Sequence, residues 1–354
     1  MIAGGGTGGH LFPAIAVAEE FDAKCPNAKI TFVGTARGLE ARIIPHTRWD
    51  LILMKVPSIK GMGFFTKVKT VLYMPIAFIR AFFILMKVRP SIVISVGGYS
   101  AGPITLVAAL IGKKTVAMEQ NAVAGLTNRI LGRFVKKVFV TFPESARYFP
   151  KKKVIVSGNP VRRKIKELLR SKPTKHHGFN LLLFGGSQGA RTINEKMLDA
   201  LNYLTDVRDD IHIVHQVGRA EDIERFSAAY RAKGFSAEAY HFIEDMGKAY
   251  LTADLVICRA GSTSLAELTV AARPAILIPY PYAADNHQEA NARSLADEGA
   301  AIMIRNSELT GELLAEQIKK LIEEPLSLAS MAEAMRRRAK PEAGRQIVEE
   351  CLIV

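Results

Sequence analysis

Short apolar segments alternate with amphipathic segments along the whole chain. The apolar segments contain few polar residues, as in ITFV (30–33), IVISV (92–96) and LLLF (181–184). Continuous apolar strands separated by helices are typical of parallel sheets that are covered on both faces. The pattern therefore predicts an α/β protein. Strands are expected at 30–33, 51–56, 92–96, 115–118, 137–141, 153–156, 181–184, 211–215, 255–258, 275–278 and 301–304, and helices at 10–24, 189–204, 219–232, 285–298 and 342–353.

The second half of the chain repeats the beginning of the first. FNLLLFGGSQGAR reads as a strand, a glycine-rich turn and a helix, as does MIAGGGTGGHLF at the start. We therefore expect two doubly wound, Rossmann-like domains that face a cleft, with a break near Pro160. Only Met1–Ala3 precede the first glycines, so the first strand is very short or lacks residues at its start. The predicted divisions are 1–158, 159–340 and a last helix at 341–354 that packs back on the first domain.

The positive charge lies in the first half. The net charge is +14, but residues 1–160 alone carry 22 basic and 7 acidic side chains. Residues 51–118 contain nine basic residues and no acidic one. Such an asymmetry indicates a nucleic acid, a membrane surface or an anionic substrate as the partner of this half.

Segment 64–88 is both apolar and basic. Pro75 and Arg80 interrupt it, which argues against a helix that spans a membrane. A basic helix rich in Phe, Ile and Leu is typical of attachment to an anionic membrane surface, and the alternative is an ordinary crossover helix that packs on the core. The candidate membrane residues are Phe64, Phe65, Lys67, Lys69, Arg80, Phe82, Phe83 and Lys87.

The glycine turns indicate anionic ligands. GGGTGGH (4–10) fits the dinucleotide pattern G-x-G-x-x-G, but a nicotinamide site also needs an acidic residue at the end of the second strand. ITFVGTARG and IHIVHQVG lack it, which argues against a dehydrogenase. Similar turns at 97–103 and 185–190 remain candidates for holding phosphates at helix N-termini.

Glu267 has two interpretations. With Ser264 it fits a helix capping box, S-x-x-E, and it could equally accept hydrogen bonds from a ribose. The residues alone leave both open. No D-x-D occurs in the chain, so the usual acidic clamp for a metal-bridged sugar nucleotide is missing. The three cysteines are far apart and form neither a zinc pattern nor a disulfide framework, which fits a reducing compartment.

Six motifs, taken together, resemble the MurG family of N-acetylglucosaminyltransferases. They are AGGGTGGHLFPAIAVA, GGYSAGP, EQNAVAGLTNR, GNPVR, GGSQGAR and the RAG…E…P…Q series, in this order from about residue 3 to about 345. The resemblance implies a GT-B fold and transfer of GlcNAc from UDP-GlcNAc to a polyprenyl-pyrophosphate-linked MurNAc-pentapeptide, the step that makes lipid II for peptidoglycan. It implies an acceptor domain at 1–158 that associates peripherally with the cytoplasmic face of the membrane, a donor domain at 159–340, and no metal or cofactor. Further partners among cell-wall and division proteins stay open, and nucleic acid is not expected.

Carried over by position, the resemblance assigns the site residues. Glu267 would bind the ribose, the backbone of Ile243 the uracil, and Arg162 the donor diphosphate. The donor-binding residues would be Thr7, Gly8, Gly9, Asn121, Arg162, Ser187, Ile243, Ser262, Thr263, Ser264, Leu265, Ala266, Glu267 and Gln288. The acceptor-binding residues would be His10, Tyr99 and Asn128.

Two residues compete as the catalytic base. His10 ends the first glycine turn, and histidine titrates near neutral pH; Glu119 is the rival. The family usually has His before EQN, where this chain has Met118, so the resemblance places more weight on His10. Another GT-B glycolipid synthase is the main alternative function. An epimerase would leave the basic apolar segment unexplained, and a nucleic-acid-binding protein would interleave its aromatic and basic residues on strands.

Overall fold

The chain divides into two compact units. The computed structural model describes residues 1–56, 64–98, 100–169, 178–186, 189–219 and 222–354. Unit 1 comprises Met1–Arg162 and Glu342–Val354, and unit 2 comprises Arg163–Pro341. The corresponding divisions predicted from the sequence lie at 158/159 and 340/341. The chain thus leaves unit 1 once and returns to it once.

Unit 1 is built on a parallel sheet in the order β3-β2-β1-β4-β5-β6-β7. The central strand β1 has only two residues, and Ile2 pairs with Phe32 on one side and Ile94 on the other. The described strands are β1 (Ile2–Ala3), β2 (Thr31–Gly34), β3 (Asp50–Leu53), β4 (Ile92–Ser95), β5 (Lys114–Glu119), β6 (Lys137–Val140) and β7 (Val154–Val156).

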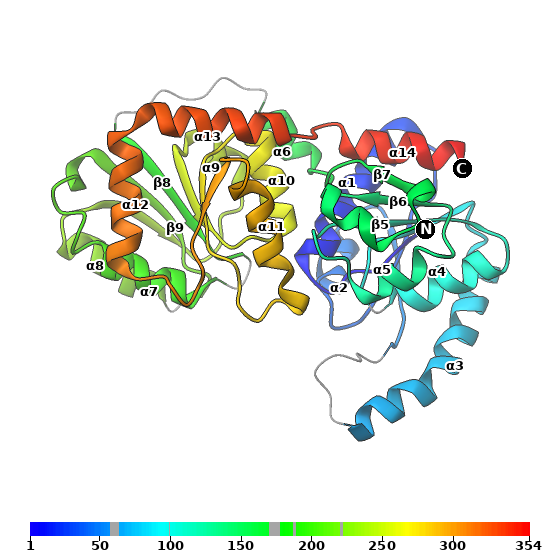
Figure 1. Cartoon of the computed structure of the whole chain (residues 1–354). Helices are drawn as coiled ribbons and strands as arrows, with labels where there is room; N and C mark the ends of the chain where they lie inside the picture. The colour runs from blue at the N-terminus through cyan, green and yellow to red at the C-terminus, as the bar shows by residue number, and fades with distance from the viewer. Residues whose placement is uncertain (57–63, 99, 170–177, 187–188, 220–221) are drawn as a thin grey trace. The chain divides into compact units, whose positions relative to one another are not determined.

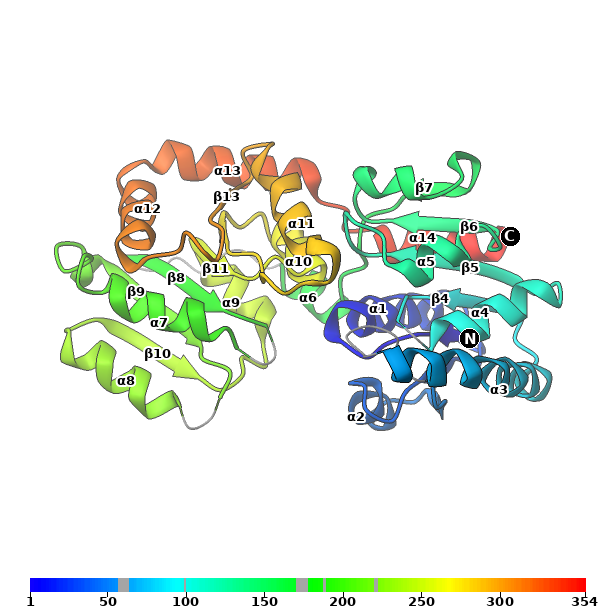
Figure 2. The same cartoon turned by 60° about the horizontal axis from the view of Figure 1, so that its bottom comes forward.

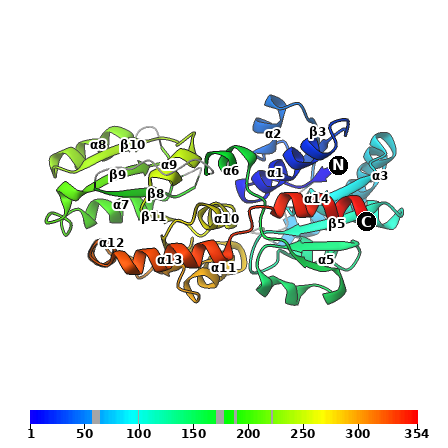
Figure 3. The ribbon, with the colours of Figure 1, turned by 90° about the horizontal axis from the view of Figure 1, so that it is seen from above.

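Helices cover both faces of this sheet. Ile2 and Phe32 belong to a core with α1 and α14, whereas Ala3 and Val33 belong to the opposite core with α3 and α4. Figure 3 shows α14 alongside α1, where Ile347 is fully buried. The helices are α1 (Gly8–Lys24), α2 (Glu40–Ile43), α3 (Phe64–Val88), α4 (Ala101–Leu110), α5 (Leu126–Leu131) and α14 (Ala343–Ile353), with short 3₁₀ helices at Ile44–His46, Pro143–Tyr148 and Lys151–Lys153.

Unit 2 has a second parallel sheet, in the order β10-β9-β8-β11-β12-β13. Figure 2 shows β10, β9, β8 and β11 side by side. Its hydrophobic core is formed by residues of the sheet together with residues of α7, α8, α12 and α13. The strands are β8 (Phe179–Phe184), β9 (Ile211–Gln216), β10 (Ser236–Tyr240), β11 (Leu255–Cys258), β12 (Ala275–Leu277) and β13 (Ala301–Met303). The helices are α6 (Arg163–Leu169), α7 (Arg191–Ala200), α8 (Ile223–Ala232), α9 (Met246–Thr252), α10 (Ser262–Ala271), α11 (His287–Ala296), α12 (Gly311–Glu323) and α13 (Pro325–Arg338), with 3₁₀ helices at Arg208–Asp210 and Ala284–Asn286.

Helix α3 projects from unit 1, and its C-terminal part lies beside α4 (Figure 1). Ala77, Ala81 and Leu85 are fully buried and form the side of the helix that packs on the sheet. Within the described residues, no helix combines the length and the apolar character needed to cross a membrane.

Candidate active site

In each sheet the strand order reverses at one pair of neighbouring strands: successive strands are added outwards on one side of the first and then outwards on the other side. In unit 1 this pair is β1 and β4, and in unit 2 it is β8 and β11. Ligands of open parallel sheets bind outside the carboxyl ends of the strands at such a pair. The turns that follow these four strands include the glycine-rich stretches of the sequence. The fold therefore places the predicted motifs where each sheet can bind a ligand.

The first turn brings the backbone of two loops into contact. The three glycines at 4–6 all have positive φ. A Cβ on Gly4 would lie 2.2 Å from the carbonyl oxygen of Gly97, so only glycine permits this approach. Helix α1 then begins at Gly8 with Thr7 as its N-cap. The predicted residues Thr7, Gly8 and Gly9 thus form the start of α1.

His10 lies in the first turn of α1 and faces the loop after β4. Its Nδ1 is 3.0 Å from Oε1 of the buried Gln120, and a Cβ on Gly97 would lie 3.0 Å from its Cε1. When Gln120 accepts with Oε1, Nδ1 of the neutral ring carries the proton. Nε2 is then the nitrogen that can take up a proton.

Glu119 ends β5 and is almost fully buried. Its Oε1 accepts a hydrogen bond from the amide of Asn121 at 3.0 Å. Its Oε2 accepts from the amide of Gly125 at 3.0 Å and from Nδ2 of Asn128 at 2.9 Å. Both carboxylate oxygens therefore organise the loop between β5 and α5.

Asn128 and Met118 face the interior. Nδ2 of Asn128 also donates to the carbonyl oxygen of Met118 at 2.8 Å, and the side chain is 2% exposed. Met118 occupies the position where the family usually has His, and here its side chain belongs to the apolar core beneath α1. The structure thus brings His10, Glu119, Asn121 and Asn128 together in unit 1.

Arg162 lies at the end of the first segment of unit 1 and stacks on Phe12 of α1. The guanidinium carbon is 4.5 Å from the centroid of the Phe12 ring. Such stacking orients a guanidinium while its N–H groups stay directed at other partners. The predicted donor residue is thus tied to the helix that carries His10.

In unit 2, the side chain of Gln216 forms hydrogen bonds to two segments that contain predicted site residues. Its Nε2 donates to the carbonyl oxygen of Gly186 in the turn after β8, at 2.9 Å. Its Oε1 accepts from the amide of Ile243 at 2.9 Å. The amide of Ile243 therefore has a hydrogen-bond acceptor within the protein. The carbonyl oxygen of Ile243 is the other backbone group of this residue that could form a hydrogen bond with a base. Ser187 of this turn and Tyr99 of unit 1 lie outside the described residues.

Helix α10 points its N-terminus at the carboxyl end of β11. Gly261 is its N-cap, and the side chain of Ser262 is buried. The hydroxyl of Thr263 is buried and has no hydrogen-bond partner among the described residues. The predicted residues Ser262, Thr263, Ser264, Leu265 and Ala266 form the first turn and the start of the second. A helix N-terminus of this kind favours an anionic group.

Glu267 is buried in α10 and accepts a hydrogen bond from the hydroxyl of Tyr250 at 3.0 Å. A capping box requires Ser264 to be the N-cap, but the helix begins two residues earlier, after Gly261. The capping-box interpretation is therefore wrong. Tyr250 comes from α9, so two helices fix the orientation of this carboxylate.

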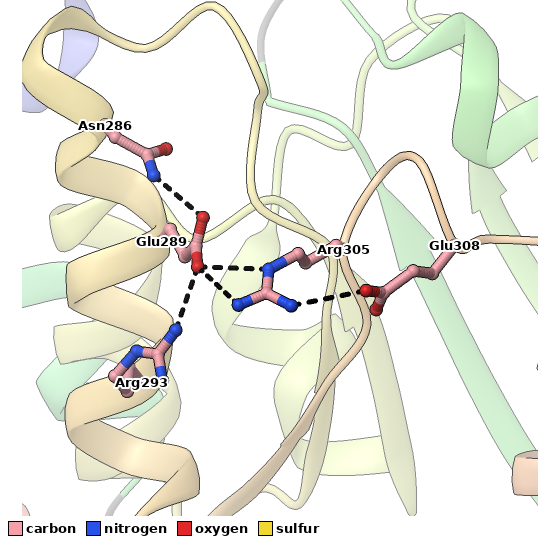
Figure 4. Close-up of polar contacts among 5 residues, drawn as sticks. All are labelled: Asn286, Glu289, Arg293, Arg305 and Glu308. Atoms are coloured by element: carbon pink, nitrogen blue, oxygen red, sulfur yellow. Dashed lines mark hydrogen bonds and ion pairs between the residues drawn. The ribbon is translucent and has the colours of Figure 1, made fainter.

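Gln288 lies in the first turn of α11. Its Oε1 accepts from the amide of Tyr280 at 3.0 Å, which leaves the Nε2 group to donate to a ligand. Next to it, Glu289 accepts from Asn286 at 2.7 Å and from Arg293 at 2.9 Å (Figure 4).

Arg305 completes this network from the loop after β13. Its guanidinium donates to Glu289 at 3.1 Å and to Glu308 at 3.2 Å (Figure 4). These hydrogen bonds, first that of Asn286 and then those of the arginines, lower the pKa of the Glu289 carboxyl. The network fixes the start of α11 and thereby the position of Gln288.

The candidate membrane residues lie on α3. Phe82 and Phe83 are 41% and 65% exposed, and Lys87 is exposed as well. Arg80 is exposed and donates to the hydroxyl of Tyr73 at 3.0 Å. For Phe64, Phe65, Lys67 and Lys69, the structure describes the helical backbone only.

Several residues of the site carry no motif signal. Gln216 and Tyr250 hold predicted residues in place, but each is a single polar residue within an ordinary segment. Glu40, beneath the first turn, is also in this group. Gln120 stands in the EQNAVAGLTNR motif, but nothing in the sequence marks it as the partner of His10. The described part of the chain contains no group of three or more His, Cys, Asp or Glu side chains arranged to hold a metal ion.

Comparisons with known proteins agree with this architecture. The glycosyltransferase family 28 N-terminal domain matches residues 1–140, and the family 28 C-terminal domain matches residues 180–347. A protein of Myxococcus xanthus is 48% identical over 99% of this chain and 92% of its own length, and one of Citrifermentans bemidjiense is 44% identical over 98% and 97%. Both are named UDP-N-acetylglucosamine--N-acetylmuramyl-(pentapeptide) pyrophosphoryl-undecaprenol N-acetylglucosamine transferase.

Solved structures give the same result. The crystal structure of Acinetobacter baumannii MurG has a TM-score of 0.81 and 33% identity, covering 100% of this chain and 99% of that one. A UDP-N-acetylglucosamine 2-epimerase, at 14% identity and a TM-score of 0.70, shares the fold alone. Two parallel-sheet units with turns of this kind at both switch points define a GT-B glycosyltransferase. The chain belongs to the MurG family.

Proposed function

We propose that this protein transfers GlcNAc from UDP-GlcNAc to the 4-hydroxyl of MurNAc in a polyprenyl-pyrophosphate-linked MurNAc-pentapeptide. The names of relatives that are 44–48% identical over nearly the whole chain support this assignment. The donor binds to unit 2 and the acceptor to unit 1. The product is the disaccharide-pentapeptide lipid used to build peptidoglycan.

The reaction is an inverting displacement at the anomeric carbon of GlcNAc. The 4-hydroxyl oxygen forms the new bond to this carbon while its proton passes to the base. The bond from the anomeric carbon to the phosphate oxygen breaks, and UDP leaves with the electron pair. The leaving diphosphate gains negative charge, which the N-terminus of α10 and the guanidinium of Arg162 stabilise.

The donor roles follow the geometry of unit 2. Glu267, oriented by Tyr250, accepts hydrogen bonds from the ribose hydroxyls. The hydroxyl of Thr263, which has no hydrogen-bond partner in the described part of the chain, donates to a diphosphate oxygen. Gln288 donates through Nε2 to a GlcNAc hydroxyl, and the Ile243 carbonyl accepts from the uracil. Thr7, Gly8 and Gly9 of unit 1, together with Asn121, complete the donor contacts, with Ser187 as a further proposed ligand.

The base is His10. One observation carries this choice: Gln120 engages Nδ1 and leaves Nε2 to take up a proton. Glu119 is a weaker candidate because amide and side-chain donors already engage both of its oxygens. Glu119 and Asn128 instead shape the loop that receives the acceptor. Tyr99 is a further proposed acceptor contact.

The test is single-turnover transfer with both substrates saturating. Loss of a general base costs about 10²- to 10⁴-fold in rate, which is the loss expected for His10→Ala. His46→Ala changes an exposed histidine of the same unit and should leave the rate unchanged. A near-normal rate for His10→Ala would remove this residue from the mechanism, and Glu119→Gln would be tested next.

A different GT-B glycolipid synthase is the competing function. It would transfer the sugar to a lipid that lacks the muramyl sugar. Radiolabelled UDP-GlcNAc, offered with the polyprenyl-linked MurNAc-pentapeptide or with diacylglycerol, separates the two. Label in the diacylglycerol product alone would overturn the assignment.

We further propose that unit 1 attaches peripherally to the cytoplasmic face of an anionic membrane. Its acceptor carries a polyprenyl chain, so the enzyme must work at a lipid surface. Helix α3 offers exposed Ile79, Phe82 and Phe83 next to basic residues, while its other side packs on the sheet. Partners among cell-wall and division proteins stay a prediction of the family resemblance.

A further inference from the structure

Glu40 is a fully buried carboxylate at the start of α2, outside every predicted motif. Its Oε2 accepts a hydrogen bond from the amide of Gly6 at 2.7 Å. Its Oε1 accepts from the amide of Thr35 at 2.7 Å and from the Thr35 hydroxyl at 3.2 Å. The carboxylate therefore joins the loop after β2 to the first glycine turn, which is 34 residues away in the sequence.

Three glycines make room for this carboxylate. A Cβ on Gly5 would lie 2.5 Å from Oε2, and one on Gly38 would lie 2.2 Å from the same atom. A Cβ on Gly34 would lie 2.2 Å from Cγ of Glu40. Side chains at these positions would expel the carboxylate, so the first turn and the loop after β2 are shaped around it.

The carboxylate also changes what the first turn can bind. In a phosphate-binding turn the backbone amides point at the ligand. Here the Gly6 amide already donates to an internal anion, and a second anion placed beside the buried carboxylate would be repelled. The turn is thus held in shape by the protein itself rather than by a ligand.

We propose that Glu40 is a positioning residue for the transfer reaction. By fixing Gly6 it sets the start of α1, and so the direction in which His10 presents Nε2. The inference rests on the proposed role of His10 as the base. Because a buried carboxylate is stable only when its oxygens are hydrogen-bonded, the same contacts that satisfy Glu40 also fix the turn.

The experiment compares Glu40→Gln with the wild type in transfer kinetics. A glutamine has one acceptor oxygen and would turn its NH₂ group towards one of the two amide donors, so the turn shifts. A misplacement of about 1 Å costs on the order of 100-fold, and we expect kcat to fall about 10- to 100-fold. The KM for UDP-GlcNAc should change less than kcat, because the donor contacts of Glu267 and Gln288 in unit 2 are unchanged. Thr35→Val, which removes only the hydroxyl donor, should give a smaller loss in a folded protein.

Asp22→Asn is the matched control for stability. Asp22 accepts from Nε1 of Trp49 at 2.8 Å near the other end of α1, so its loss weakens unit 1 away from His10. Unfolding temperatures are measured for each variant. If kcat falls only in step with the unfolding temperature, and equally for Asp22→Asn, Glu40 is merely structural and the proposal is wrong.

The double variant with His10→Ala separates the remaining outcomes. If Glu40 acts through His10, Glu40→Gln should lower kcat less than about threefold further in the His10→Ala background. An equal loss in both backgrounds overturns the proposal while leaving His10 as the base. A normal rate for His10→Ala alone refutes the base assignment itself, and the Glu40 proposal with it.

Discussion

His215 is a histidine that the protein keeps neutral. It is fully buried in unit 2, with Nδ1 2.8 Å from the hydroxyl of Tyr230 and Nε2 3.1 Å from Oδ1 of Asn194. Burial lowers its pKa to about 3 and raises the pKa of Tyr230. Neither residue lies in a predicted motif, so this network serves the core rather than the reaction.

The low pKa of His215 predicts a loss of stability in acid. An unfolded histidine has a pKa of about 6.5, so between pH 6.5 and 3 the unfolded state binds the extra proton. The free energy of unfolding should therefore fall as the pH drops below 6.5, by up to roughly 1.4 kcal/mol per pH unit from this residue. At pH 7.5 this stability is fully present.

Urea unfolding of the wild type and His215→Gln at pH 7.5 and 4.5 checks this. The variant should be less stable at pH 7.5, and the difference between the two proteins should shrink by about 2–3 kcal/mol at pH 4.5. Parallel pH dependence of the two proteins would contradict the assignment.

At the residue scale, the sequence marks candidate site residues more readily than the residues that hold them in place. His10 and Glu267 lie in helices that follow glycine-rich or small-residue turns, and these turns mark them as candidates. That Gln120 pairs with His10, and Tyr250 with Glu267, is recognisable only in the fold, because a hydrogen bond between distant segments leaves no characteristic spacing in the sequence. Glu40 is hidden in the same way.

At the element scale, strands with a continuous apolar run are predictable, and the one edge strand that lacks such a run is not. All the expected strands form, because each carries a run of apolar residues; the central ones are buried, whereas the edge strands β3 and β7 are partly exposed. β10 was not predicted: SAEAY lies at the sheet edge, where alternate residues are exposed, and it lacks a continuous apolar run. Ser264 is a plausible N-cap by residue type, but the N-cap of α10 is Gly261.

The end of α10 carries a strained residue. Ala272 follows the helix with φ 53° and ψ 45°, a left-handed conformation that favours glycine. Ala272→Gly should therefore raise the free energy of unfolding by about 0.5–1 kcal/mol, after the greater freedom of glycine in the unfolded chain is allowed for. Chemical denaturation measures the change, and the transfer rate should be unaffected.

Ala271→Gly is the comparison, because its position is helical. It should destabilise the protein by about 1 kcal/mol. If both substitutions lower the stability, the left-handed conformation of Ala272 is not a source of strain.

At the scale of the whole molecule, the charge follows the division into units. Unit 1 carries 24 basic and 10 acidic side chains, whereas unit 2 carries 24 of each. The entire net charge of +14 therefore belongs to the unit that bears α3. Each basic residue near an anionic membrane contributes about 1 kcal/mol, so this asymmetry favours attachment through unit 1 alone.

Sedimentation with vesicles that contain phosphatidylglycerol tests the attachment. Ile79 and Phe83 are 58% and 65% exposed, and changing both to Ser removes apolar surface that would enter the lipid. We expect at least about tenfold weaker binding, and weaker binding of the wild type in high salt. Leu326→Ser, at an 85% exposed position of unit 2, is the control and should bind like the wild type. Unchanged sedimentation of the α3 variant would refute the proposal.

The two-unit architecture was predictable because the strand–turn–helix pattern restarts after residue 178. The sequence pattern does not fix the order of strands in each sheet, since parallel strands of similar apolar character could pair in several orders. The switch points, which bring the four turns together in pairs, emerge only from that order.

The return of α14 to unit 1 has a consequence for how the chain is made. Ile347 and Val348 complete the core under α1, yet the whole of unit 2, residues 163–341, is synthesised before them. At about 5–20 residues per second, the ribosome needs roughly 10–40 s for that stretch. During this time the nascent first unit has an uncovered apolar face on α1. Unit 2 is one continuous segment, so it can fold as soon as it has been synthesised. Unit 1 is synthesised first, but its core is completed last.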